Sequence, residues 1–112
     1  MGSQENHGRL VNAILVALTK LPHCRIWKNS TGVARSIDGA RAISFGLKGS
    51  ADIIGLLGPN GHFIAIEVKT GNARQTKQQV AFQAMIARLG GTYLICRSLD
   101  DAVSFAAFQA NK

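Results

Sequence analysis

The sequence predicts an α/β domain in which a mixed β-sheet is flanked by helices, with the element order α-β-β-β-α-β and a further helix at the end. Two observations carry this prediction. Apolar residues recur at helical spacing in three separate segments, and the central strands have apolar side chains on both faces, so that helices must cover both sides of the sheet. The chain has 112 residues, of which 46% are hydrophobic and 17% charged, enough to bury one core. We therefore expect residues 1–112 to form a single domain.

The first part of the chain predicts a helix, a strand and a long connection. The helix covers residues 4–21, because apolar residues repeat every three or four positions until Pro22 ends it. A short alternating strand follows at Cys24–Lys28. Residues 29–49 are polar, basic and rich in glycine, so we expect a long loop, functional or mobile, with one short strand at Ala42–Phe45.

Two apolar strands, 51–57 and 62–69, are separated by the turn residues Gly58-Pro59-Asn60-Gly61 and are predicted to form a hairpin. With these four residues as the loop, Asp52 lies directly opposite Glu67 on one face of the sheet, roughly 5 Å away at Cβ. Lys69 points to the same face, two residues beyond Glu67. The hairpin therefore gathers two carboxylates and one ammonium at one end of an otherwise apolar strand pair.

The rest of the chain predicts a helix at 76–89, a buried strand at Thr92–Cys96 and a last helix at 100–110. Gly90-Gly91 ends the first of these helices. Its core-facing residues are expected at helical spacing: Val80, Phe82, Met85, Ile86 and Leu89.

The net charge of +7 favours a polyanionic partner, although a merely soluble basic domain would have the same composition. The six acids are more informative than the 13 Lys and Arg. Asp100 and Asp101 fit the first turn of the last helix, and Asp38 precedes a turn glycine. Three acids have no such structural role: Glu5, Asp52 and Glu67.

The predicted carboxylate pair suits Mg²⁺ or Mn²⁺, which prefer oxygen ligands, and no His and Cys pattern for zinc is present. The main-chain carbonyl of Val68 can add a ligand, and Lys69 can orient a water or neutralise charge in a transition state. Such a site suits hydrolysis of phosphodiesters. The alternative is a set of surface ion pairs, but charges among the apolar residues of central strands are costly unless paired or bound to a metal. The histidines are interpreted as surface or turn residues: His7, His23 and His62.

Cys24 and Cys96 lie in predicted strands and form no close-spaced metal pattern. They are interpreted as buried free thiols of an intracellular protein, with a disulfide between them as the alternative. No apolar run approaches the roughly 20 residues of a membrane span, and the start of the chain lacks the features of a secretion signal. Met1-Gly2-Ser3 is compatible with a cloning scar. The expected location is the cytoplasm, which could be that of a phage-infected bacterium.

Asp52 followed by Glu67-Val68-Lys69 resembles the signature of the PD-(D/E)XK nuclease superfamily. A longer ordered set is similar to the stand-alone form of its virus-type replication-repair nuclease domain, VRR-NUC, and the resemblance runs from about Glu5 to Val103. The set comprises Gly49, Asp52-Ile53-Ile54-Gly55, Gly61-x-Phe63, Ile66-Glu67-Val68-Lys69, Gln79 with Phe82, Gly90-Gly91 and Arg97-Ser98-Leu99-Asp100-Asp101. Two residues depart from the pattern without affecting chemistry: Ala51 replaces the Pro of the superfamily name, and Phe82 stands where many relatives have Trp.

The resemblance implies a PD-(D/E)XK nuclease-like core and a metal-dependent nuclease. Asp52, Glu67 and the Val68 carbonyl would bind Mg²⁺ or Mn²⁺, and Lys69 would be the catalytic lysine. Glu5 matches an extra acid on the first helix that helps the metal site. Gln79 matches a glutamine near the active site, with the neighbouring Gln78 as the rival residue.

Several basic residues flank the motifs and are hypothesised to contact DNA phosphates, with plain solvated charges as the alternative: Arg35, Arg41, Lys48, Arg74 and Lys77. No recognition-helix motif indicates base reading, so DNA structure is the expected target. Stand-alone members of the family resemble Holliday junction resolvases, which implies a homodimer that cuts four-way junctions with two symmetric sites. The alternatives are a flap or other branched-DNA nuclease, an inactive nucleic-acid-binding module of the same fold, and a restriction or RNA-processing nuclease.

Overall fold

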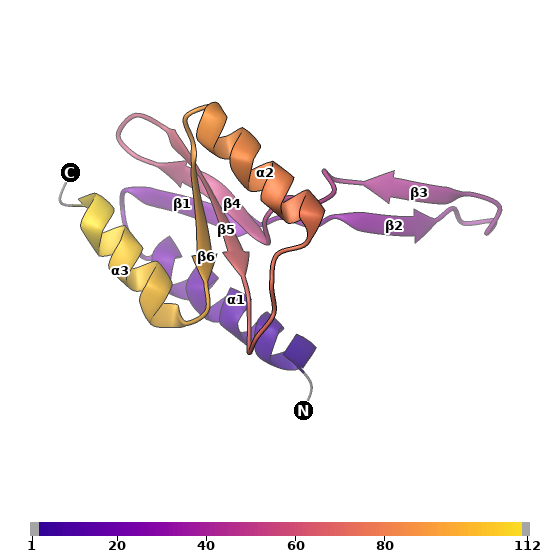
Figure 1. Cartoon of the computed structure of the whole chain (residues 1–112), viewed down its shortest axis with the longest axis horizontal. Helices are drawn as coiled ribbons and strands as arrows, with labels where there is room; N and C mark the ends of the chain where they lie inside the picture. Colours follow the sequence, from indigo (N-terminus) through magenta and orange to yellow (C-terminus); the bar gives the residue numbers. More distant parts are fainter. Residues whose placement is uncertain (1–2, 111–112) are drawn as a thin grey trace.

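The computed structural model describes residues 3–110, with side chains described for residues 6–107. Its core is a four-stranded mixed sheet in the order β1-β4-β5-β6. The strands are β1 (Cys24–Lys28), β4 (Ile53–Leu57), β5 (His62–Val68) and β6 (Thr92–Cys96). Neighbours among β1, β4 and β5 are antiparallel, whereas β6 runs parallel to β5. The helices are α1 (Ser3–Thr19), α2 (Lys77–Arg88) and α3 (Leu99–Ala110) (Figure 1). The predicted α/β fold, a mixed sheet flanked by helices, is confirmed.

Two hydrophobic clusters cover the two faces of the sheet. On one face, residues such as Ile53 and Ile66 pack with the buried stripes of α1 and α3. On the other, Ala65 packs with Phe82 and Ile86 of α2. The expected burial of both faces holds at the centre of the sheet, but α2 does not reach across its β1 side. Trp27 on β1 is 47% exposed there.

The predicted hairpin and its register are confirmed. Leu57 pairs with His62, and Ile53 pairs with Ile66. Extending this register by one residue, just ahead of β4, places Asp52 across from Glu67. The chemistry-bearing residues thus come together at the end of the sheet where β4 begins and β5 ends.

The prediction of a long loop over residues 29–49 was wrong. Most of this segment is an antiparallel hairpin of β2 (Gly32–Arg35) and β3 (Ala42–Phe45). We call residues 29–49 the arm; Figure 1 shows it projecting away from the central sheet. Every residue of both strands is exposed. The strand β3 was predicted, but β2 was not, because a strand without a buried face lacks the apolar–polar alternation that identifies strands in a sequence.

Helix α2 is defined at both ends by side-chain and backbone caps. Thr76 is its N-cap and forms a capping box with Gln79. At the other end Gly90 has a positive φ of 92°. The amides of Gly90 and Gly91 donate to the carbonyls of Ala87 and Ile86, a Schellman motif.

Two residues expected in the core, Val80 and Leu89, are exposed. The buried stripe of α2 runs through Phe82 and Ile86 instead, and Leu89 is already the C-cap. Among residues 3–110, none of the helices has the length and apolar character that a membrane span requires. Cys24 and Cys96 are buried free thiols, as expected, and burial raises the pKa of Cys96 to about 12.

Candidate active site

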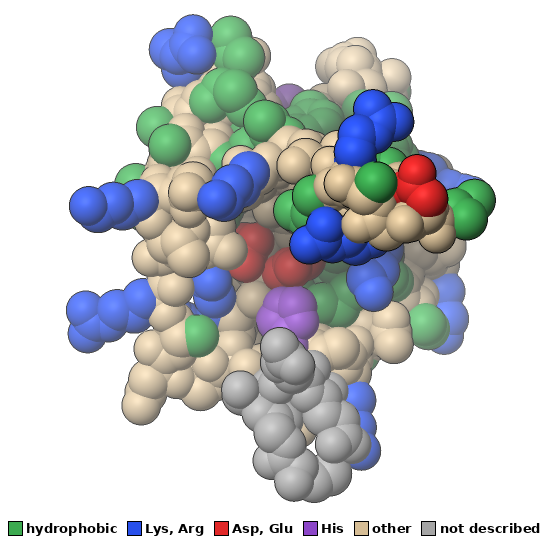
Figure 2. All heavy atoms as spheres, turned by 90° about the vertical axis from the view of Figure 1, so that its right-hand side faces the viewer, with side chains coloured by type: hydrophobic (Ala, Val, Ile, Leu, Met, Phe, Trp, Pro, Cys, Tyr) green, Lys and Arg blue, Asp and Glu red, His purple; other side chains and the backbone are tan. Residues whose placement is uncertain are grey.

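A pocket of about 300 Å³ opens at the end of the sheet, beside the last residues of β5. Figure 2 shows acidic side chains and a histidine in a hollow of the surface, bordered by Lys and Arg side chains. The pocket is lined by residues from α1, β5, α2 and the connections between the elements: His7, Asp52, Glu67, Val68, Lys69, Thr70, Ala73 and Gln79. The four residues predicted to form the centre of the site, Asp52, Glu67, Val68 and Lys69, therefore lie together.

Asp52 is held from two sides through one carboxylate oxygen. Its Oδ2 accepts a hydrogen bond of 2.8 Å from the amide of Val68 on β5. The same oxygen lies 3.1 Å from Nε2 of His7 on α1. The side chain is 27% exposed, so the carboxylate borders both the protein interior and the pocket.

Glu67 is almost fully buried, with only 3% of its surface exposed. Its Oε2 accepts from Gln79 Nε2 at 3.1 Å and lies 3.5 Å from the Lys69 ammonium. Its Oε1 is buried without a hydrogen-bond partner. Burial, reinforced by the charge of Asp52 and partly offset by Lys69, raises the pKa of Glu67 to about 7.

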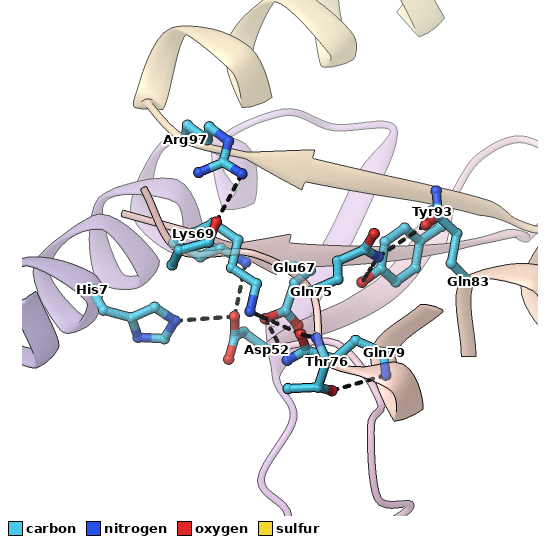
Figure 3. Close-up of polar contacts among 12 residues, drawn as sticks. His7, Asp52, Glu67, Lys69, Gln75, Thr76, Gln79, Gln83, Tyr93 and Arg97 are labelled. Atoms are coloured by element: carbon cyan, nitrogen blue, oxygen red, sulfur yellow. Dashed lines mark hydrogen bonds and ion pairs between the residues drawn. The ribbon is translucent and has the colours of Figure 1, made fainter. Parts of the chain in front are cut away.

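Gln79 joins the capping of α2 to the pocket (Figure 3). Its Oε1 accepts from the amide of Thr76 at 2.9 Å and from Lys69 Nζ at 2.8 Å, while its Nε2 donates to Glu67. As the third residue of α2, Gln79 is placed by the capping box itself. Between the two glutamines considered in the sequence, the structure brings Gln79 into the pocket.

The connection between β5 and α2 forms one wall of the pocket and is held by Arg97. The guanidinium of Arg97, just after β6, donates to the carbonyls of Gly71 at 3.3 Å and Ala73 at 2.9 Å. Arg97 was not among the predicted site residues. A contact between a side chain and the main chain 26 residues away cannot be predicted from the spacing of residues in the sequence.

The base of the arm is fixed beside Asp52. The amide of Asn29 donates to the Asp52 carbonyl at 2.8 Å, and its side-chain amide donates to the Ala51 carbonyl at 2.9 Å. Gly49 packs so closely on α2 that a Cβ there would lie 2.6 Å from the Gln78 carbonyl oxygen. The arm therefore leaves the body of the domain next to the pocket.

The five basic residues predicted to bind DNA are all exposed and fall into two groups. Arg35, Arg41 and Lys48 lie on the arm. Arg74 and Lys77 lie in the connection before α2 and at its first residue. Glu5 falls in α1, but its side chain is outside the described part of the structure.

His7 was predicted to be a surface or turn residue, but it lines the pocket. His7 continues the buried stripe of α1 toward its N-terminus, four residues before Val11 and seven before Ile14. That spacing was available in the sequence and would have predicted that position 7 faces the sheet.

A divalent cation fits the donor set of the pocket. The buried Oε1 of Glu67 has no partner, next to the carboxylate of Asp52, and a cation would satisfy both. The described residues contain no cluster of three or more His, Cys, Asp or Glu side chains suited to a metal. Mg²⁺ commonly binds through one or two carboxylates and completes its shell with water and substrate phosphates, so the carboxylates of Asp52 and Glu67 suit it.

Two carboxylates, a lysine and a glutamine at the end of such a sheet define an α/β domain with a nuclease-like core. The chain matches the family model of the VRR-NUC domain over residues 6–100 and belongs to this family. Membership indicates a nuclease-type function with DNA as the substrate. A comparison with curated proteins found no match.

Proposed function

We propose that this domain is a Mg²⁺- or Mn²⁺-dependent endonuclease that hydrolyses phosphodiesters in branched DNA, with four-way junctions as the preferred substrate. The observation that carries the proposal is the buried, unpartnered Oε1 of Glu67 beside Asp52 in a pocket of a basic chain. A protein that binds polyanions gains nothing from buried acids unless those acids hold a cation.

Asp52, Glu67 and the main-chain carbonyl of Val68 would hold the cation, with Glu5 as a further candidate. When bound, Mg²⁺ or Mn²⁺ polarises a phosphoryl oxygen and lowers the pKa of a bound water. Because burial raises the pKa of Glu67 to about 7, cation binding would release a proton from the fraction of molecules in which this side chain is neutral.

Lys69 is proposed to be the catalytic lysine. Gln79 and Glu67 hold its ammonium within 2.8 Å and 3.5 Å, respectively. An ammonium has three donors, so Lys69 can make these contacts and still donate into the pocket, toward a water or a phosphate oxygen. Gln79 positions both Lys69 and Glu67, which makes it part of the proposed site.

The exposed basic residues on both sides of the pocket support DNA binding through phosphates. Arg35, Arg41 and Lys48 on the arm, with Arg74 and Lys77 before and on α2, would place the duplex arms around the scissile phosphate. Such contacts recognise the path of the backbone rather than the base sequence.

Resolution of a four-way junction requires two symmetric cuts, and a two-fold homodimer supplies two pockets. We therefore propose that the active form is a homodimer. A protein that sediments as a monomer while cutting junctions symmetrically at nanomolar concentration would contradict this. The competing proposals are a nuclease acting on flaps and an inactive module that only binds nucleic acid.

The test is cleavage of a labelled four-way junction, a flap and a matched linear duplex with Mg²⁺, Mn²⁺ or EDTA, using wild type and Lys69→Ala. We expect metal-dependent, symmetric cutting of the junction by wild type and a loss of at least about 100-fold in the variant, because one charge-stabilising donor typically contributes that much. Lys20→Ala, which removes an exposed lysine just after the end of α1 that is distant from the pocket, serves as the charge control and should retain cutting.

If wild type and Lys69→Ala both bind DNA and neither cuts it, the result would support the inactive nucleic-acid-binding module. Cutting confined to the flap would replace the junction as substrate and would remove the argument for a dimer.

A further inference from the structure

His7 contributes a hydrogen bond to the proposed metal ligand Asp52. The imidazole Nε2 lies 3.1 Å from Asp52 Oδ2, and both residues line the pocket. An ionised carboxylate can only accept, so the proton of this hydrogen bond belongs to Nε2 of His7. Figure 3 shows the imidazole reaching from α1 toward the carboxylate.

The two donors to Asp52 both bind the same carboxylate oxygen, so the two oxygens differ in the number of hydrogen bonds that they accept. Oδ2 accepts from both His7 and the amide of Val68, the latter at 2.8 Å. A carboxylate has about four acceptor sites, roughly two on each oxygen. The two donors therefore occupy both acceptor sites of Oδ2. Oδ1 is then the oxygen better placed to bind a cation.

The rotation of α1 is set independently of the pocket. Val11, Ile14 and Leu18 are buried against the sheet and α3. His7 lies on the same stripe of the helix, one turn before Val11. Packing of the apolar residues therefore aims position 7 at the end of the sheet where Asp52 lies, before any ligand is bound.

We propose that His7 is a positioning residue that holds the Asp52 carboxylate in the orientation that binds the divalent cation. The inference rests on the proposed function, because it assigns His7 to the same site. Hydrogen-bond partners of metal ligands fix the ligand's orientation, and their loss typically lowers metal affinity 10- to 100-fold. His7 itself stays outside the coordination shell.

The test measures Mn²⁺ binding directly, by electron paramagnetic resonance titration of the full chain at pH 8. His7→Ala is expected to weaken Mn²⁺ binding about 10- to 100-fold. In His7→Gln the side-chain amide can donate in place of Nε2–H, so most of the affinity should be retained. The control is His62→Ala, since His62 contacts Thr92 at the opposite end of β5. Thermal unfolding of each variant verifies the fold.

Three results would overturn the role of His7: wild-type affinity in His7→Ala, equal weakening in His7→Gln and His7→Ala, or a nitrogen coupling to Mn²⁺ that disappears in His7→Ala. The last would make His7 a direct ligand. If wild type binds no Mn²⁺ at all, the proposed metal site fails and this inference fails with it, whereas normal binding by His7→Ala removes only the role of His7.

Discussion

Folding changes the ionisation of Glu67 near neutral pH. Its carboxylate is buried next to Asp52, and the nearby Lys69 only partly compensates, so its pKa rises from 4.5 to about 7. Without a cation, part of the population therefore carries a neutral Glu67 at neutral pH. The same burial that makes the side chain expensive to ionise makes it receptive to a cation.

This pKa predicts how the stability of the metal-free protein depends on pH. A carboxyl whose pKa is higher in the folded state stabilises the fold while it is protonated, and that contribution is lost as the pH rises through about 7. Between pH 5 and pH 8 in EDTA, the unfolding temperature of wild type should fall relative to that of Glu67→Gln, which cannot ionise. Parallel curves for the two proteins would show that Glu67 titrates normally.

At the scale of elements, the arm and α2 meet at Gly49. Gly49 has a positive φ of 85°, and a Cβ would meet the main chain of Gln78. The arm leaves the body beside Asp52, and α2 contributes Gln79 to the pocket, so this contact links a segment next to the pocket with one that lines it. Their relative position depends on that close approach.

Gly49→Ala is expected to destabilise the domain by about 2–4 kcal/mol, combining left-handed strain with overpacking against α2. Gly39→Ala is the matched control, because Gly39 has a similar φ of 73° but open space around it, and should cost only about 1–2 kcal/mol. Urea unfolding measures both. Equal losses of unfolding free energy in the two variants would mean that α2 moves aside to accommodate the Cβ at position 49 without cost.

The elements also differ in how far the sequence could predict them. The hairpin of β4 and β5 was predictable because its turn residues and apolar strands fix the register together, and that register brought Asp52, Glu67 and Lys69 to one place. The arm was not predictable as a hairpin, because its exposed strands have no burial pattern. The helical spacing of His7 could have predicted that it faces the sheet, but its partner Asp52 is 45 residues away. The contacts of Arg97 with Gly71 and Ala73 are visible only in the packed fold.

At the scale of the whole molecule, the arm makes the domain more extended than its length requires. The radius of gyration is 15.1 Å, against about 13 Å for a compact chain of this size. The arm carries three basic residues away from the body, while Asp52 and Glu67 lie back in the pocket. The charge distribution therefore separates a basic periphery from an acidic centre.

This separation predicts which charges set the salt dependence of DNA binding. Replacing Arg35 and Arg41 with Ala should lower the slope of log affinity against log salt by about 2, because each phosphate contact contributes about one. The control pair, Lys20→Ala with Arg88→Ala, removes the same charge from the ends of α1 and α2 distant from the pocket. Fluorescence anisotropy in EDTA measures binding without cleavage. Equal slopes for the two double variants would mean that the arm touches no phosphate.

The turn at 58–61 lies at the far end of β4 and β5 from the pocket, yet its length decides whether the pocket exists. One residue inserted or removed there would shift the register of β4 against β5 by one residue. Either Asp52 or Glu67 would then point to the opposite face of the sheet. The arm, which pairs only with itself among the described strands, has no such constraint on its length. Insertions and deletions in related genes should therefore collect in the arm, beside the pocket, and be excluded from the turn at the opposite end of the sheet.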